Sequence, residues 1–125
     1  MTTNRILIID DEHDIRAVAQ LTLKTIGGWN VLSASSGHQG LDKAAEERPD
    51  AILLDVMMPD MDGIETFRAL KANPATQSIP VILMTAKVQA AEQRRFAKLD
   101  VAGIITKPFK AIKLPEQIAQ ILGWS

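Results

Sequence analysis

The sequence predicts an α/β fold in which short buried strands alternate with helices along one domain. Short apolar runs recur along the chain, and several of them end in an acidic or hydroxyl side chain. Segments with apolar residues at helical spacing separate these runs. Glycine and proline residues mark the ends of the helical segments. Alternation of this kind implies βαβ units with right-handed crossovers, and therefore a parallel sheet covered by helices on both faces.

Composition limits the classes of protein to which the chain can belong. The chain has 125 residues, a formal net charge of −1 and no cysteine. This length suits one domain with one core, and the missing cysteines exclude disulfides and thiolate metal sites. Scattered charges favour neither nucleic acid nor a membrane surface as partner, and the first apolar run, residues 6–9, is too short for a signal peptide or a membrane span. We expect a single cytoplasmic domain over residues 1–125, with no output domain.

The first half of the chain predicts two strands and two helices. Residues 5–9 form a buried strand, and a helix follows over residues 14–26, where Gly27-Gly28 ends it. The apolar face predicted for this helix consists of Ile15, Val18, Ala19, Thr22 and Ile26. Residues 29–34 form a weaker strand. Ser36-x-x-Gln39 then reads as a capping box that opens a helix to about Glu47.

The second half continues the alternation. The predicted elements are a strand over 51–55, a helix over 64–72, a strand over 80–84, a helix over 89–99, a strand over 103–106 and a final helix over 115–122. The run at 51–55 is apolar throughout until Asp55, which is typical of a central strand buried on both faces. Ligands of open α/β sheets bind outside the carboxyl ends of the strands, so Asp55 is a candidate functional residue as well as a candidate turn residue.

Polar side chains end or directly follow four of the predicted strands. They are Asp10 and Asp11, Asp55, Thr85, and Lys107. In a parallel sheet all carboxyl ends lie on one edge, so we expect these side chains to gather there. Converging carboxylates repel one another unless a cation is present, and Mg²⁺ prefers a few carboxylates plus water. A lysine and a hydroxyl opposite the metal supply donors to phosphoryl oxygens, so the set describes an aspartyl-phosphate site.

In these motifs the chain resembles the receiver domain of two-component response regulators, of the stand-alone kind found in chemotaxis regulators. The resemblance rests on Asp10-Asp11-Glu12, on the segment 54–59 with Asp62-Gly63, on Met84-Thr85-Ala86 and on Lys107-Pro108-Phe109. It implies a flavodoxin-like, doubly wound sheet in strand order 2-1-3-4-5 and a cis bond before Pro108. It further implies Asp55 as phosphoacceptor, Thr85 and Lys107 as contacts of the phosphoryl group, and Mg²⁺ held by Asp10, Asp11, Asp55 and the Met57 carbonyl.

The implied function is a switch. A sensor histidine kinase or phosphotransfer protein would donate the phosphoryl group from a phosphohistidine, and hydrolysis of the acyl phosphate would reset the domain, which is therefore not a turnover enzyme. Phosphorylation would change the face formed by the fourth helix, the last strand and the last helix, where a downstream protein or a second copy would bind. The family commonly carries an aromatic residue at the position of Ile104, so the resemblance leaves the coupling to this face open.

Other readings account for less of the sequence. A haloacid dehalogenase-like phosphohydrolase requires a second aspartate where Met57 stands, and a nucleotide-binding fold requires a glycine-rich turn after the first strand. His13 and His38 have no partner set typical of a phosphohistidine carrier, and we expect His13 to face solvent. The alternative that stays open is a receiver-fold docking or dimerisation module that is not controlled by phosphorylation.

Overall fold

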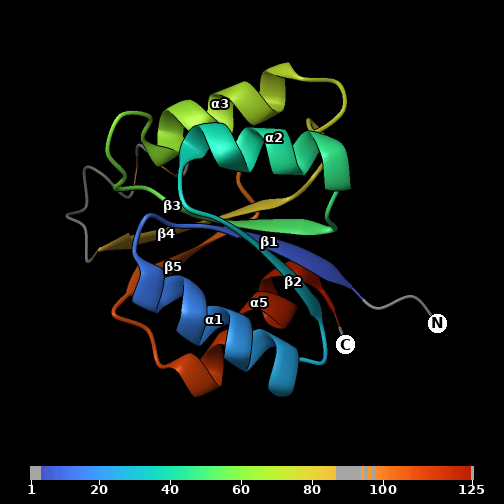
Figure 1. The fold of residues 1–125 in the computed structure, drawn as a ribbon, viewed down its shortest axis with the longest axis vertical. Helices are drawn as coiled ribbons and strands as arrows, with labels where there is room; N and C mark the ends of the chain where they lie inside the picture. The colour runs from blue at the N-terminus through green and yellow to red at the C-terminus, as the bar shows by residue number, and fades with distance from the viewer. Residues whose placement is uncertain (1–3, 87–93, 95, 97, 125) are drawn as a thin grey trace.

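The computed structural model describes residues 4–86, 94, 96 and 98–124, and it contains a five-stranded parallel sheet between two layers of helices (Figure 1). The described elements are β1 (Arg5–Ile9), α1 (His13–Thr25), β2 (Asn30–Ala34), α2 (Gly37–Glu47), β3 (Ala51–Asp55), α3 (Gly63–Ala72), β4 (Val81–Ala86), β5 (Gly103–Lys107), the 3₁₀ turn η1 (Ala111–Lys113) and α5 (Leu114–Leu122). The strand order is β2-β1-β3-β4-β5. The predicted fold class and strand order are confirmed, whereas most of the helix predicted over 89–99 lies outside the described residues.

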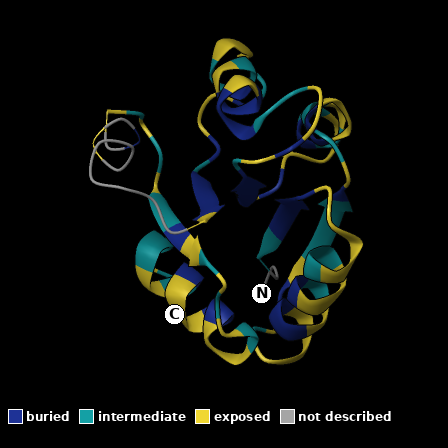
Figure 2. Ribbon diagram, turned by 90° about the vertical axis from the view of Figure 1, so that its left-hand side faces the viewer, coloured by how far each residue is buried: buried dark blue, intermediate teal, exposed yellow. Residues whose placement is uncertain are grey.

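Helices α2 and α3 cover one face of the sheet, and α1 and α5 cover the other (Figure 1). Successive side chains of a strand pack against opposite helix layers. In β1, Leu7 and Ile9 pack on the α2 and α3 side, whereas Ile6 and Ile8 pack on the α1 and α5 side. Figure 2 shows the buried strands between helices whose exposed residues face outward. Because both faces are covered, β1, β3 and β4 are apolar at nearly every position.

The apolar face predicted for α1 is partly wrong. Ala19 and Thr22 are buried as expected, but the third buried residue is Leu23, and Val18 and Ile26 are 44% and 57% exposed. Residues at positions i, i+3 and i+4 share a helix face, so Ala19, Thr22 and Leu23 form one stripe. The helix carries more apolar residues than one stripe holds, and the spacing alone did not decide which of them pack on the sheet.

The helix ends follow local hydrogen bonds, some of which the sequence predicted. The Ser36 side chain accepts from the Gln39 amide at 3.1 Å, but Gln39 Oε1 accepts from the Ser35 amide at 2.6 Å, so the predicted box closes one residue early. In α3 a full capping box joins Asp62 and Glu65, and this box was not predicted from the sequence. The bond between Lys107 and Pro108 is cis, as the resemblance implied.

None of the helices in the described ranges has the length and apolar character needed to cross a bilayer.

Candidate functional site

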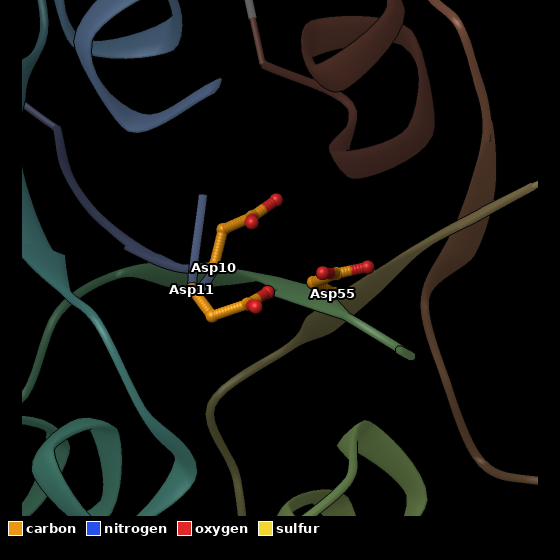
Figure 3. Close-up of side chains that lie close together, drawn as sticks. All are labelled: Asp10, Asp11 and Asp55. Carbon is orange, nitrogen blue, oxygen red and sulfur yellow. The ribbon is translucent and has the colours of Figure 1, made fainter. Parts of the chain in front are cut away.

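Three carboxylates meet at the carboxyl edge of the two central strands. Asp10 and Asp11 follow β1, Asp55 is the last residue of β3, and β1 and β3 are direct neighbours in the sheet. One oxygen of each carboxylate lies within 4.8 Å of the others, and Figure 3 shows the three side chains extending to the same side. Asp10 and Asp55 are buried, whereas Asp11 is exposed. The structure therefore brings together the three acidic residues singled out from the sequence.

Lys107 reaches this group from the edge strand β5. Its Nζ atom lies 2.8 Å from Asp10 Oδ2 and 3.3 Å from Asp55 Oδ1, and its side chain is 17% exposed. Strand β4 separates β5 from β3, so only a long side chain can bridge the distance. Lysine suits this place because its ammonium is a compact charge on a flexible stem.

Thr85 and Met57 flank the charged group. Strand pairing sets Met84 opposite Asp55, so Thr85 lies one residue further toward the carboxyl edge. Its hydroxyl is buried and donates to the carbonyl of Ala86 at 3.2 Å, a local bond that a phosphoryl oxygen could replace. Met57 is 73% exposed, and its amide donates to Asp55 Oδ1 at 3.3 Å. Its carbonyl as a metal ligand stays a prediction.

Asp10 makes two further contacts that were not predicted from the sequence. Asp10 Oδ1 accepts from the Glu12 amide at 2.8 Å, and the Asp10 carbonyl accepts from Arg16 Nη1 at 2.8 Å. Glu12 is the N-cap of α1, and Arg16 lies in the first turn of that helix. The only sequence feature that pointed to Arg16 was its place in the first half of the helix that follows the acid pair.

Burial and neighbouring charges shift the pKa values of Asp55 and Lys107. Burial and the charge of Asp10 raise the pKa of Asp55 from 3.8 to about 6, although Lys107 and the Met57 amide oppose this shift. Burial lowers the pKa of Lys107, but its hydrogen bond to Asp10 and the charges of Asp55 and Asp10 outweigh burial and leave the pKa above its usual value. Lys107 therefore stays charged, whereas the site destabilises the ionised form of Asp55.

Gly63 makes room for the backbone of Asp55. A Cβ atom at Gly63 would lie 2.3 Å from the carbonyl oxygen of Asp55 and 2.6 Å from Cα of Val56. The amide of Gly63 also donates to the carbonyl of Val56 at 2.9 Å. The start of α3 thus packs directly on the backbone that carries Asp55, and only glycine fits there.

The donor set fits a hard divalent cation. The ligand atoms that Asp10, Asp11 and Asp55 offer are all carboxylate oxygens, which Mg²⁺ and Ca²⁺ prefer. When the three groups are ionised they carry one negative charge each, and Lys107 offsets only one of them. A cation at this place would remove the remaining repulsion, so the acidic group is a candidate Mg²⁺ site.

The chain is similar in sequence to curated transcriptional regulatory proteins. The chain is 35% identical over 118 residues to the alkaline phosphatase synthesis transcriptional regulatory protein PhoP of Bacillus subtilis, covering 94% of this chain and 48% of that protein. It is 34% identical over 122 residues to the phosphate regulon transcriptional regulatory protein PhoB of Pseudomonas aeruginosa, covering 98% of this chain and 53% of that protein. The chain thus spans about half the length of these curated relatives.

Solved structures of the same fold include a chemotaxis response regulator. The chemotaxis response regulator CheY4 of Vibrio cholerae matches with a TM-score of 0.87 at 28% identity, covering 96% of this chain and 99% of that one. The N-terminal domain of a response regulator receiver protein from Methanoculleus marisnigri JR1 matches with a TM-score of 0.78 at 34% identity, covering 99% of this chain and all of that one. A family model described as the response regulator receiver domain matches residues 6–119. The chain therefore belongs to the response regulator receiver domain family of two-component signalling.

Proposed function

We propose that residues 1–125 act as a single phosphoacceptor unit in which the carboxylate of Asp55 receives a phosphoryl group. The observation that carries this proposal is the position of Asp55: it is buried at the end of a central strand, 3.3 Å from Lys107 Nζ and in the same acidic group as Asp10 and Asp11. Receiver domains in general work as phosphoacceptor switches and not as turnover enzymes. We propose the same for this chain.

Each residue of the site has a distinct part in the proposed transfer. Asp55 attacks phosphorus through a carboxylate oxygen, forming an acyl phosphate as the bond to the donor breaks. Lys107 and Thr85 donate hydrogen bonds to the oxygens of the transferred group, where negative charge is concentrated. Because the acceptor and these donors are held on the ends of packed strands, most of the catalysis comes from positioning and charge neutralisation.

Asp10, Asp11, Asp55 and the Met57 carbonyl would hold Mg²⁺ during this transfer. When bound, Mg²⁺ supplies charge neutralisation between the acceptor carboxylate and the phosphoryl oxygens. Support comes from the oxygen-only donor set and from the raised pKa of Asp55, whose burial and nearness to Asp10 disfavour the charged form. Water at the same place would later hydrolyse the acyl phosphate and reset the switch.

The donor we propose is a phosphohistidine on a sensor histidine kinase or on a phosphotransfer protein. A groove of about 480 Å³ lies beside Lys107 and is lined in part by Ile15, Val18 and Phe109. These apolar side chains offer a protein partner a contact surface next to the acceptor. The output we propose is a changed surface around β5 and α5, together with residues 89–99, for a downstream protein or a second copy of the chain.

Incubation with acetyl phosphate tests the proposal without knowledge of the cognate kinase. We expect the intact protein to gain the mass of one phosphoryl group in millimolar Mg²⁺ and to gain none in excess EDTA. Lys107→Met should slow the gain strongly, because it removes the ammonium beside the acceptor. No labelling at all would instead favour the docking or dimerisation module, whereas equal labelling with and without Mg²⁺ would contradict the proposed cation site.

A further inference from the structure

Arg16 ties helix α1 to the end of strand β1. Its guanidinium donates from Nη1 to the carbonyl of Asp10 at 2.8 Å, and its own amide donates to the carbonyl of Glu12 at 3.1 Å. The side chain is partly buried. The Asp10 carbonyl belongs to the peptide group that joins Asp10 to Asp11. The bond from Arg16 therefore restrains the orientation of that peptide group.

The two acids of this pair are held in different ways. Asp10 is buried, its amide donates to the Ala34 carbonyl at 3.1 Å, and its two carboxylate oxygens accept from Glu12 and Lys107. Asp11 is exposed, and its carboxylate has no hydrogen bond to any residue that the structure describes. The place of the Asp11 carboxylate therefore depends on its backbone, whose preceding peptide group is bound by Arg16.

We infer that Arg16 is a positioning residue for the cation site, which acts by directing the carboxylate of Asp11 toward Asp55. This inference rests on the proposed function, because it concerns the site that would hold Mg²⁺. Groups that orient metal ligands commonly change metal affinity by about 10- to 100-fold when they are removed. Arg16 would touch neither the cation nor the phosphoryl group, and it would act through the peptide group between Asp10 and Asp11.

The charge of Arg16 allows a test in which two explanations predict opposite changes in the affinity for Mg²⁺. A guanidinium near the acidic group repels a divalent cation, so on Coulomb's law alone its removal should tighten Mg²⁺ binding. If Arg16 positions Asp11, its removal should weaken Mg²⁺ binding in spite of the lost repulsion. A role in general stability alone would lower the melting temperature and leave the affinity unchanged.

The measurement is a Mg²⁺ titration of isotope-labelled protein, followed by amide chemical shifts at constant ionic strength. We expect Arg16→Met to raise the Mg²⁺ dissociation constant about tenfold, and Arg16→Lys, which keeps the charge and a donor, to raise it less. Lys24→Met is the matched control, because Lys24 lies on the same helix and is exposed, and its loss changes the net charge equally. The control should bind Mg²⁺ as the wild type does.

The outcomes separate this inference from the proposed function. A wild type that binds no Mg²⁺ would overturn both. A wild type that binds, with Arg16→Met binding equally well or more tightly, would overturn the positioning role and leave the proposed function standing. Melting in EDTA establishes that each variant is folded; if Arg16→Met is not, Arg16→Gln, which lacks the charge and has a shorter reach, takes its place with the same two outcomes.

Discussion

Asp55 holds a charge that the metal-free fold disfavours. Burial and the neighbouring Asp10 raise its pKa to about 6, even though Lys107 lies 3.3 Å away. In the unfolded chain the same carboxyl titrates near 3.8. Between these two values the folded protein binds more protons than the unfolded chain, so this group lowers stability as the pH rises from about 4 to about 6. Above about pH 6 the loss of stability caused by the ionised Asp55 carboxylate is complete and no longer changes with pH.

The first prediction concerns Asp55→Asn in EDTA. The amide keeps the shape of the side chain and removes the buried charge, so the variant should be more stable than the wild type by about 1 to 2 kcal/mol near neutral pH. The difference should shrink toward about pH 4, where Asp55 is protonated in the folded protein. Urea unfolding at both pH values measures it. A variant that is less stable than the wild type at neutral pH would contradict the claim that the ionised Asp55 carboxylate destabilises the metal-free fold.

The second prediction concerns the lifetime of the phosphoryl group. Met57 is 73% exposed beside the site, and its thioether is too weak an acceptor to orient an attacking water. Met57→Asn should therefore quicken loss of the phosphoryl group several-fold, which can be followed as decay of labelled protein after the donor is removed. Met61→Asn, in the same loop, is the control. Unchanged or slower decay in Met57→Asn would refute this explanation.

At the residue scale, strand ends made part of the site predictable. Asp10, Asp11, Asp55 and Lys107 each follow or end an apolar run, and parallel pairing alone brings such positions together. The roles of Glu12 and Arg16 were not predictable, because their bonds to Asp10 depend on how α1 turns back on β1. A sequence gives the residues of such a turn but not the direction of its peptide groups.

At the element scale, the type of each helix or strand was easier to predict than its ends or the face that it buries. The sequence predicted residues 5–9 and 51–55 as strands with the bounds that the structure has. For β4 it expected an end at Met84, whereas the strand continues to Ala86. Strands end where pairing ends, and the pairing of Thr85 with Thr106 on β5 is not visible in β4 alone. The face of α1 was partly wrong for a similar reason: its packing partners lie elsewhere in the chain.

The third prediction concerns the contact between α3 and β3. Gly63→Ala would place a methyl group against the Asp55 carbonyl and Val56 Cα, both backbone atoms, so helix and strand must separate. We expect a loss of about 1 to 3 kcal/mol in stability and slower labelling of Asp55 by acetyl phosphate. Gly28→Ala is the control, because its positive φ of 71° makes alanine strained there without any contact near the site. Normal labelling of Gly63→Ala would show that this contact does not position Asp55.

At the scale of the whole molecule, strand pairing places the residues next to Asp55 beside β4, and β4 beside the edge strand β5. Thr85 on β4 pairs with Thr106 on β5, and Ile104 lies two residues before Thr106 on the same strand. Ile104 is partly buried and packs against the core on the α2 and α3 side. An isoleucine is stiff at its first torsion, so we expect Ile104 to change the exposed surface less than an aromatic residue with a buried and an exposed rotamer would.

The fourth prediction follows from this arrangement of strands. Binding of beryllofluoride, a phosphoryl mimic, should change amide chemical shifts at the Asp55 edge and also along β5, while Ile104 itself should shift less than Thr106. Ile104→Tyr should enlarge the changes on β5 and α5, with Ile112→Tyr, at an exposed apolar position, as the control. Changes confined to the Asp55 edge in both the wild type and Ile104→Tyr would reject propagation to β5.

The most direct measurement is to locate the phosphoryl group on the chain. Wild-type protein labelled by acetyl phosphate in Mg²⁺ should carry the group on Asp55 alone when its peptides are mapped by mass. Asp55→Asn should take up none, whereas Asp42→Asn, which removes an exposed carboxylate on α2, should label as the wild type does. Stoichiometric labelling of Asp55→Asn at another residue would contradict the claim that the carboxyl edge of β3 is the phosphoacceptor site.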